Sequence, residues 1–417
     1  MNNRVSNKLI LDEMRGCFDF FWNESNSNST EGYGLTLDKL YLKKENDYKN
    51  DWLSSVACVG FGLCSYMIGV ERGWITFNEG YERSKRTLET IKKVETYHGL
   101  LPHFLFQETG KTNGSEFSTI DTAIFLMGAV TCGEYFKGDV RKLAMELYNQ
   151  VDWCHFLREK DGKLQLNMAY SNGSWRETKG YCPANWDHYA EQMMIYLLIG
   201  GRSDIDENIA LNLFDGFDRN IGKYKGNEFV YCFNNPLFIH QFTHCFFDFR
   251  QYLDKNGYDW FKNSVDATIA NRRFCIDQKK HKSFGKNSWG LTAFQGKDRY
   301  MVFGSPPQGF EHVKCNQRLE AYVAPYGALS SINFLPNEVI KALKHFTKIK
   351  GLKQKYGFTD SYNLDIGYVS DCYIGIDKGP TIIMLDNYLY GTTWKYFMNS
   401  EVCQTAIKRL KFIKREN

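Results

Sequence analysis

The sequence has few prolines, little net charge and no long apolar run. Only 8 of its 417 residues are proline. Its 52 Lys and Arg against 48 Asp and Glu give a formal charge of +4, without the basic stripe that marks nucleic-acid binding. The longest uncharged apolar stretch, Val56–Val70, spans 15 residues, whereas a membrane-crossing helix needs about 20. We therefore expect neither nucleic acid nor a membrane as a partner.

The chain also lacks the marks of secretion and of a cysteine framework. Charged residues at Arg4, Lys8, Asp12 and Glu13 interrupt the apolar segment that a secretory signal requires. We expect a cytoplasmic protein, or one exported by another route. The 12 cysteines are scattered and include no C-x-x-C pair, which favours reduced, buried thiols over disulfides.

Aromatic residues, in contrast, are abundant. The chain has 31 Phe, 26 Tyr and 9 Trp, together 16% of its residues, more than a compact core requires. The hydrophobic share of 43% and the charged share of 24% are ordinary for a globular protein. Because sugar rings stack on aromatic side chains, the composition indicates a groove that binds carbohydrate.

Helical periodicity dominates the pattern of apolar residues. Twelve helices in sequence predict six helical hairpins, and no linker or composition shift divides the chain, so we expect one domain over residues 1–417. The expected helices lie near 5–24, 52–70, 77–95, 117–136, 139–158, 185–200, 205–218, 236–255, 258–279, 322–332, 336–349 and 379–398, with a terminal segment at 400–412.

The remaining segments are long and lack helical periodicity, and loops of such length are usually functional. If the six hairpins close into a ring, these loops gather at one mouth and form a groove. The sequence thus predicts an all-α protein, an (α/α)6 toroid with long loops at one mouth. The loop segments lie near 26–50, 98–116, 159–184, 280–321 and 352–378.

Two carboxylates lie where a loop enters an apolar helix, at Glu116 and Asp121. Five residues at about 100° each place them about 140° apart around a helix, so they do not share one face. Asp121 is flanked by apolar residues, which raises the pKa of a carboxyl group unless it is paired. A helix cap plus a structural Asp is the alternative interpretation.

A third carboxylate, Glu191, stands in an apolar and aromatic stretch that follows Asn185, the expected cap of a helix starting at Trp186. Burying an unpaired charge there is costly, so such a glutamate tends to be protonated or functional. The alternative is a partly exposed Glu on the polar side of the helix. Two carboxylates across a cleft are the minimum equipment for cleaving a glycosidic bond.

His240, His244 and Asp248 recur every four residues in an expected helix and would share one face. Such a face can bind a metal, but the zinc-protease pattern requires Glu at position 241, where this chain has Gln. We prefer a polar strip that binds substrate hydroxyls or a neighbouring helix, and we expect no metal and no cofactor.

Several stretches, in order along nearly the whole chain, resemble the glucoamylase-like domain of bacterial endo-β-1,2-glucanases and of the transglycosylase module in cyclic β-1,2-glucan synthases. The stretches that carry the resemblance are Phe18–Trp22, Ser55–Leu63, Ile68–Trp74, Ser115–Ala123, His240–Arg250, Trp289–Ala293, Ala324–Tyr326 and Tyr373–Asp377.

The resemblance implies an (α/α)6 toroid with its active site at one mouth. It also implies that Glu191 is the general acid and that Glu116 matches the nucleophile of the transglycosylating branch. The endoglucanase branch carries several acidic residues in this region, of which only Asp121 is matched here, so hydrolysis and transglycosylation both stay open. Lys378 replaces the Gln usual in the family, and a lysine at the groove wall would alter the sugar contacts.

We therefore expect an enzyme that cleaves a β-1,2-linked glucan with paired carboxylates. Glu191 protonates the glycosidic oxygen, Glu116 acts from the other side as a nucleophile or through a water, and Asp121 orients or tunes Glu116. The residues expected to stack on sugar rings or bind their hydroxyls are His103, Phe104, Tyr170, Trp175, Trp186, His240, Gln241, His244, Trp289, Asp371, Tyr373 and Asp377.

Two other classes of protein stay open. A non-catalytic glycan-binding toroid keeps the groove but holds its carboxylates in inert ion pairs. A metal-dependent toroid enzyme holds zinc at His240 and His244. Sugar binding without bond cleavage identifies the first class, and stoichiometric zinc identifies the second.

Overall fold

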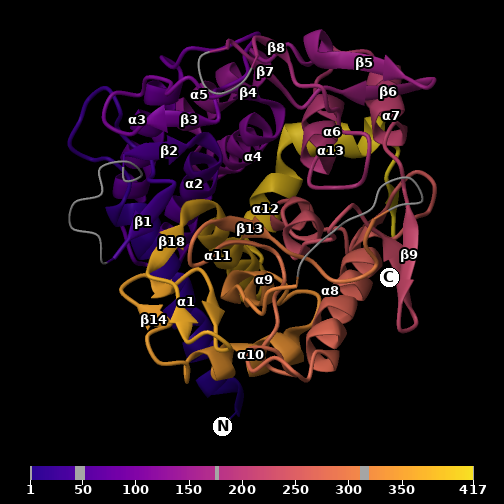
Figure 1. The fold of residues 1–417 in the computed structure, drawn as a ribbon. Coiled ribbons are helices and arrows are strands. Elements are labelled where there is room, and N and C mark those ends of the chain that lie inside the picture. The colour runs from indigo at the N-terminus through magenta and orange to yellow at the C-terminus, as the bar shows by residue number, and fades with distance from the viewer. Residues whose placement is uncertain (1, 43–51, 174–177, 310–318, 417) are drawn as a thin grey trace.

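Helices alternate between an inner and an outer layer along the chain in the computed structural model, which describes residues 2–42, 52–173, 178–309 and 319–416 (Figure 1). The inner elements are α2 (Val56–Glu71), α4 (Thr119–Phe136), α6 (Met193–Gly200), two short 3-10 turns η2 (Leu237–His240) and η3 (Thr243–Cys245), α9 (Pro325–Leu329) and α11 (Gly375–Leu389). The outer elements are α1 (Asn2–Asn23), α3 (Phe77–Ile91), α5 (Gly138–Asn149), α7 (Glu207–Asp215), α8 (Trp260–Asp277) and α10 (Pro336–Phe346).

Burial separates the two layers. All residues of α6 and nearly all of α2, α4 and α11 are buried, whereas α3, α5, α7 and α10 each bury only part of their surface. Helices that are apolar on all sides belong in a protein interior, and amphipathic helices cover them. Three further elements lie outside this alternation: η1 (Trp153–Phe156), α12 (Thr392–Asn399) and α13 (Glu401–Arg409).

The inner elements contact one another along a closed path. α2 packs on α4 and α11, α4 packs on α6, and α11 packs on α9 and η3. Hydrogen bonds complete the path, because Thr243 Oγ1 donates to the Glu191 carbonyl beside α6 and the Gln241 amide donates to the Gly327 carbonyl in α9.

Short antiparallel strands occupy the segments that lack helical periodicity. The expectation of an all-α chain is therefore confirmed only in a coarser form: the described part of the chain is mostly helical and also carries strands. The paired strands are β1 (Lys39–Tyr41) with β18 (Cys372–Ile374), β2 (Leu53–Ser55) with β3 (Phe104–Phe106), β4 (Phe117–Ser118) with β7 (Ala169–Ser171) and β8 (Gly180–Tyr181), β5 (Leu157–Lys160) with β6 (Lys163–Leu166), β9 (Ile221–Tyr224) with β10 (Asn227–Val230), β11 (Tyr252–Leu253) with β19 (Ile413–Lys414), β12 (Ala293–Gln295) with β13 (Tyr300–Val302), β14 (Lys353–Gln354) with β15 (Gly357–Phe358), and β16 (Tyr362–Asn363) with β17 (Tyr368–Val369).

The pairing of β1 with β18 joins segments more than 300 residues apart in the sequence. Lys39 lies opposite Ile374, and the Gly375 N–H donates to the Asp38 carbonyl at 2.8 Å. The two strands lie side by side, in front of α1 and α11, which also pack together (Figure 1). Early and late parts of the chain therefore form one wall.

The continuous helix expected over 236–255 is absent. η2 and η3 replace it, because other elements bind the backbone groups that a helix would use. The Trp394 indole N–H donates to the His244 carbonyl, and the Asn387 amide donates to the Cys245 carbonyl.

Two other expected helices have different bounds. The one expected over 185–200 begins only at Met193, because residues 187 and 189 exchange backbone hydrogen bonds with Asp218 and the Asn185 amide bonds to Gln165 instead of capping a helix. The one expected over 379–398 is split into α11 and α12 at Gly391, whose φ of +69° ends the helical path.

Among the residues described, no helix has the length and apolar character that spanning a membrane demands.

Two glycines lie at a close contact between the inner helices α2 and α4. A Cβ added to Gly128 in α4 would lie 2.0 Å from the carbonyl oxygen of Gly60 in α2. Gly128→Ala should therefore lower the free energy of unfolding by about 1–3 kcal/mol through overpacking, measured by urea denaturation. Gly285→Ala is the control, since a Cβ there meets nothing within 4 Å. Equal stability of the two variants would contradict this packing.

Candidate active site

A cavity of about 370 Å³ opens among the inner elements and the strands β1, β2 and β3. Its walls are largely apolar, including Ile120, Ile124 and Phe242. A cavity of this size that combines apolar walls with convergent polar groups is typical of a small-molecule site. The polar and charged side chains that line it are Asp38, Lys39, Ser55, His103, Asp121, Glu191, Tyr300, Tyr326 and Asp377.

Glu191 lies in the turn that precedes α6 and faces this cavity. Burial raises the pKa of its carboxyl group to about 7; a backbone N–H opposes this effect and the charge of Asp121 adds to it. Near neutral pH Glu191 is therefore divided between its protonated and ionised forms. A carboxyl group in this state can donate a proton to a substrate and later take one back.

Asp121 occupies the first turn of α4, as the sequence predicted, and is 6% exposed. Ser118 caps this helix: its hydroxyl accepts the Asp121 N–H at 3.2 Å and donates to Asp121 Oδ2 at 2.6 Å. The other carboxylate oxygen, Oδ1, lies 3.6 Å from His103 Nε2. Both oxygens of Asp121 thus have partners, and its carboxyl group is fixed at the cavity wall.

His103 connects two of the predicted acidic residues. Its Nδ1 lies 2.8 Å from Glu116 Oε1, on the side opposite Asp121. Although burial lowers the pKa of His103, the charges of Asp121 and Glu116 and the hydrogen bond to Glu116 raise it to about 9. His103 is therefore a cation at neutral pH that donates toward both carboxylates.

Glu116 is outside the set of residues that line the cavity. It precedes β4 and α4, and its side chain is 24% exposed. Burial raises the pKa of Glu116, but the hydrogen bond and charge of His103 outweigh this effect and lower it overall. Glu116 is an ionised carboxylate that holds the imidazole ring of His103, which departs from the position expected of a residue that attacks substrate.

Five of the polar or charged residues that line the cavity were missed by sequence reasoning: Asp38, Lys39, Ser55, Tyr300 and Tyr326. Lys39 Nζ donates to Gln295 Oε1 at 3.0 Å and lies 5.5 Å from the ring centroid of Tyr300. Tyr300 is 45% exposed although it lines the cavity, so it stands at the mouth. Asp38 and Lys39 have no local sequence signal, because only the pairing of β1 with β18 places them here.

Of the residues expected to bind sugar, His103, Phe104 and Asp377 line the cavity. Asp371 is half-buried and Tyr170 stacks on Tyr97 with ring centroids 3.8 Å apart, and neither lines it. Trp175 lies outside the described residues.

Three other expected aromatic contacts are part of the core. Trp186 is 8% exposed and its indole N–H donates to Thr119 Oγ1 at 3.0 Å. Trp289 and Tyr373 are fully buried. These rings fill space between helices and strands, so their large apolar surface explains their presence without a sugar.

The strip formed by His240, His244 and Asp248 does not exist, because no helix places the three residues on one face. His240 Nε2 bonds to Asn235 Oδ1 at 2.8 Å, and His244 Nε2 bonds to the Ser264 hydroxyl at 2.9 Å. Burial lowers the pKa of each histidine to about 3, so both are neutral.

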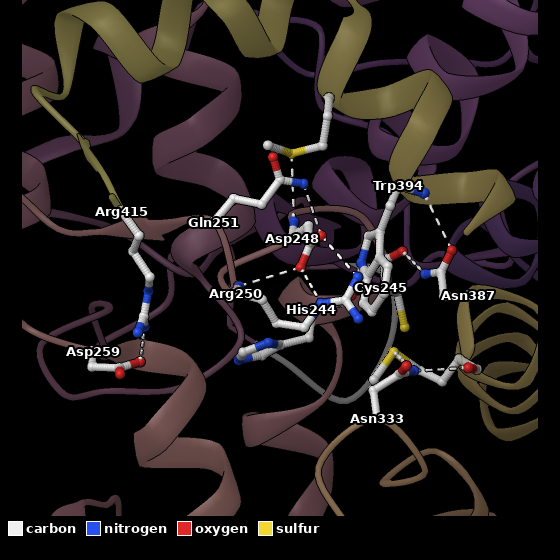
Figure 2. Close-up of polar contacts among 12 residues, drawn as sticks. His244, Cys245, Asp248, Arg250, Gln251, Asp259, Asn333, Asn387, Trp394 and Arg415 are labelled. Atoms are coloured by element: carbon white, nitrogen blue, oxygen red, sulfur yellow. Dashed lines mark hydrogen bonds and ion pairs between the residues drawn. The ribbon is translucent and has the colours of Figure 1, made fainter. Parts of the chain in front are cut away.

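Asp248 is occupied as well. Its carboxylate accepts two hydrogen bonds from the Arg250 guanidinium, one from the Arg250 backbone N–H and one from Gln251 (Figure 2). The Gln241 amide, expected to bind sugar, donates instead to the Gly327 carbonyl and the Ser331 hydroxyl. These groups stabilise the packing of the inner layer, and none of them lines the cavity.

Lys378 also points away from the cavity that was expected to hold it. Its ammonium donates to the Phe358 carbonyl at 2.6 Å and lies 3.3 Å from Glu13 Oε1 in α1. Both side chains are buried, at 7% and 1% exposure. Lys378 therefore anchors α11 to α1, and it does not line the cavity.

Among the described residues, His98, Asp152 and His155 bring three potential metal-ligand atoms within 4.8 Å of one another. The rings of His98 and His155, however, stack 3.4 Å apart at 10°. Since a metal binds in the plane of each imidazole ring, two stacked rings do not converge on one ion. This cluster lies outside the residues that line the cavity.

The alternating helical layers around a carboxylate-lined cavity define a glucoamylase-like protein. A family model described as "Putative glucoamylase" matches residues 183–401, just over half of the chain. The chain belongs to this family.

Curated and solved relatives agree with this membership. The chain is 26% identical over 455 residues to an exo β-1,2-glucooligosaccharide sophorohydrolase (non-reducing end) of Parabacteroides distasonis, covering 98% of this chain and 59% of that protein. The chain thus spans about three-fifths of the length of this relative.

Two solved structures show the same fold over almost their whole length. An endo-β-1,2-glucanase from Chitinophaga pinensis, in complex with sophorotriose and glucose, has a TM-score of 0.85 and 23% identity, covering 98% of this chain and 99% of that one. A "putative glucoamylase" from Bacteroides uniformis has a TM-score of 0.84 and 25% identity, covering 98% of each chain.

Breaking the contact between Glu116 and His103 should change the pKa of His103. Glu116→Gln removes a negative charge and a charge-assisted hydrogen bond, so the pKa of His103 should fall from about 9 toward its ordinary value. NMR titration of the His103 ring checks this shift. Glu108→Gln, at an exposed position in the loop after β3, is the matched control; an unchanged pKa in Glu116→Gln would refute the proposed contact.

Proposed function

We propose that this protein is a glycoside hydrolase that cleaves β-1,2-linked glucan chains. The observation that carries the proposal is the pair Glu191 and Asp121, which line one cavity and interact electrostatically there. Family membership and the activities named for the relatives from Parabacteroides distasonis and Chitinophaga pinensis supply the substrate class.

Glu191 is the general acid of this proposal. Its protonated form donates a proton to the glycosidic oxygen as the bond from that oxygen to the anomeric carbon breaks. The raised pKa keeps the proton available near neutral pH, which is the usual requirement for such an acid. The apolar wall around Glu191 is the physical cause of that raised pKa.

Asp121 is the carboxylate that we assign to the opposite step. It either attacks the anomeric carbon or takes a proton from a water that attacks it. Carboxyl groups about 5–5.5 Å apart favour direct attack, and groups about 6.5–9.5 Å apart leave room for a water. The cationic His103 lies 3.6 Å from Asp121 Oδ1 and keeps this oxygen in position.

Glu116 acts through His103 in this proposal and does not attack the sugar itself. Its ionised carboxylate holds the imidazole ring, which in turn faces Asp121. This arrangement supports hydrolysis over a transglycosylation reaction in which Glu116 is the nucleophile. The two reactions differ in product, since transglycosylation passes the glucan to another sugar and not to water.

Sugar rings are proposed to stack on Phe104 and Tyr300. Phe104 already stacks on His103 with ring centroids 3.8 Å apart, which fixes its face. Asp38, Lys39 and Asp377 are proposed to bind the hydroxyl groups, because their side chains also line the cavity. An uncharged glucan is recognised by such hydroxyl partners and ring faces.

The fold that carries this activity is proposed to be one domain, an (α/α)6 toroid. In the described part of the chain, six inner units, with η2 and η3 counted as one, alternate with six outer helices, and the closed path of inner contacts supports this assignment. In chain order the proposed hairpins are α1–α2, α3–α4, α5–α6, α7 with η2–η3, α8–α9 and α10–α11.

Replacing the proposed acid tests the function directly. Glu191→Gln should lower kcat on linear β-1,2-glucan by about 10²–10⁴-fold, the usual contribution of a positioned acid or base. Release of reducing ends measures the rate, and chromatography of the products separates hydrolysis from transglycosylation. Glu159→Gln in the exposed part of β5 is the matched control. Unchanged turnover in Glu191→Gln would remove Glu191 from this role; sugar binding by wild type without cleavage would identify a binding protein.

The pKa of Glu191 predicts the pH dependence. Because the acid must be protonated, kcat should be highest below the pKa of Glu191 and fall as the pH rises through about 7. Initial rates measured on both sides of that pH check the prediction. A rate that stays constant well above pH 7 would show that some other group donates the proton.

A further inference from the structure

Two buried aspartates meet at the wall of the active cavity. Asp377, in the first turn of α11, lines that cavity, and it also lines a second, very small cavity of about 10 Å³ together with Asp360. Asp360 lies between β15 and β16, and the two side chains are within hydrogen-bonding reach of each other. Asp377 is only 4% exposed and Asp360 only 6%.

Within the described ranges, the contact between Asp360 and Asp377 lacks a hydrogen-bond donor. Asp360 Oδ2 accepts the backbone N–H of Gln295. Asp360 Oδ1 and Asp377 Oδ2 are buried and accept no hydrogen bond from a donor in the described residues. Two ionised carboxylates offer only acceptors, so their contact is attractive only when one of them carries a proton.

Neighbouring cations do not replace that proton. Lys39 donates to Gln295 Oε1, and Lys378 donates to the Phe358 carbonyl and pairs with Glu13. The Tyr326 hydroxyl has one hydrogen, for which Asp377 competes with the Ala293 carbonyl at 2.7 Å. The other titratable groups that interact with the pair are Asp38, Tyr41, Cys58, Tyr300, Tyr368 and Cys372.

Burial acts in the same direction on both carboxyl groups. It raises the pKa of Asp360, and it raises the pKa of Asp377, where the charge of Asp360 adds to the effect. Two adjacent carboxyl groups in such surroundings do not both ionise near neutral pH.

We propose that Asp360 and Asp377 share one proton and titrate as a unit, with Asp360 as a positioning residue that keeps Asp377 facing the active cavity. Near neutral pH the pair then carries a single negative charge, so Asp377 offers an acceptor to a sugar hydroxyl without placing a second charge in the wall. This role in sugar binding rests on the proposed function, whereas the shared proton does not.

Infrared spectroscopy tests the shared proton without any substrate. Wild type at neutral pH should show a carbonyl band of a protonated carboxylic acid that is lost in Asp360→Asn and equally in Asp377→Asn, because each amide supplies its own hydrogen to the remaining carboxylate. An unshared proton would disappear in only one of the two variants. Glu191→Gln should remove a different band, and Asp371→Asn, nearby but outside both cavities, should remove none. Retention of the band in either aspartate variant overturns the proposal.

Sugar binding tests the positioning role separately. In the Glu191→Gln background, loss of the shared proton at alkaline pH should drive the carboxylates apart and weaken sophorotriose binding by about tenfold, the equivalent of about one pKa unit. In Glu191→Gln/Asp360→Asn this loss should be absent, because an amide does not ionise. His103 titrates in both proteins, so its effect cancels in the comparison, which calorimetry at several pH values provides.

The infrared and binding experiments together distinguish failure of the proposed function from failure of the shared proton or of the positioning role. A protein that keeps the infrared signature but neither binds nor cleaves β-1,2-glucan contradicts the proposed function alone. A protein that cleaves the glucan but lacks the signature contradicts the shared proton alone. Equal pH dependence of sophorotriose binding in the two variants, with the signature intact, contradicts the positioning role of Asp360.

Discussion

The pairing of β1 with β18 is the constraint on which the cavity depends. It places Asp38 and Lys39, from the early part of the chain, beside Ile374 and Asp377 from the late part. The inner helices then close around the same space, since α11 packs on α2 and α9. Without this antiparallel register the carboxylates of the two segments would have no common wall, and the cavity would lose one side.

The electrostatics of the cavity follow from unequal surroundings of similar groups. Glu191 faces an apolar wall, so its pKa is raised, whereas Glu116 touches the cationic His103, so its pKa is lowered. The same side chain thus holds a proton in one place and a charge in the other. Different degrees of burial and pairing are therefore sufficient to move the pKa values of these two glutamates in opposite directions.

The sequence predicted those parts of the fold that depend on local periodicity. α1, α3, α4 and α8 lie close to the expected ranges, because an amphipathic or fully apolar helix carries its own signal. The segment 236–255 has the same apolar spacing, yet it forms 3-10 turns. Its backbone carbonyls bind Trp394 and Asn387, which are more than 100 residues away, and no local pattern records such partners.

In the candidate site, too, local sequence patterns identified some residues, whereas long-range pairing placed others. Glu191 and Asp121 were found because a carboxyl group in an apolar stretch is conspicuous, and both line the cavity. His240, His244 and Trp289 were conspicuous as well, but they serve the core. Asp38, Lys39 and Tyr300 were missed, since they belong to short strands and loops that acquire a common surface only through long-range pairing.

The ion pair between Glu13 and Lys378 has a consequence for how the protein is made. Neither charge is tolerable alone in the interior, and α1 leaves the ribosome long before α11 does. During synthesis Glu13 must therefore stay exposed to water or become protonated until Lys378 has been synthesised and can pair with it. The candidate cavity is also lined by Ile376 and Asp377 of α11, so a nascent chain cannot complete this cavity before α11 has been synthesised.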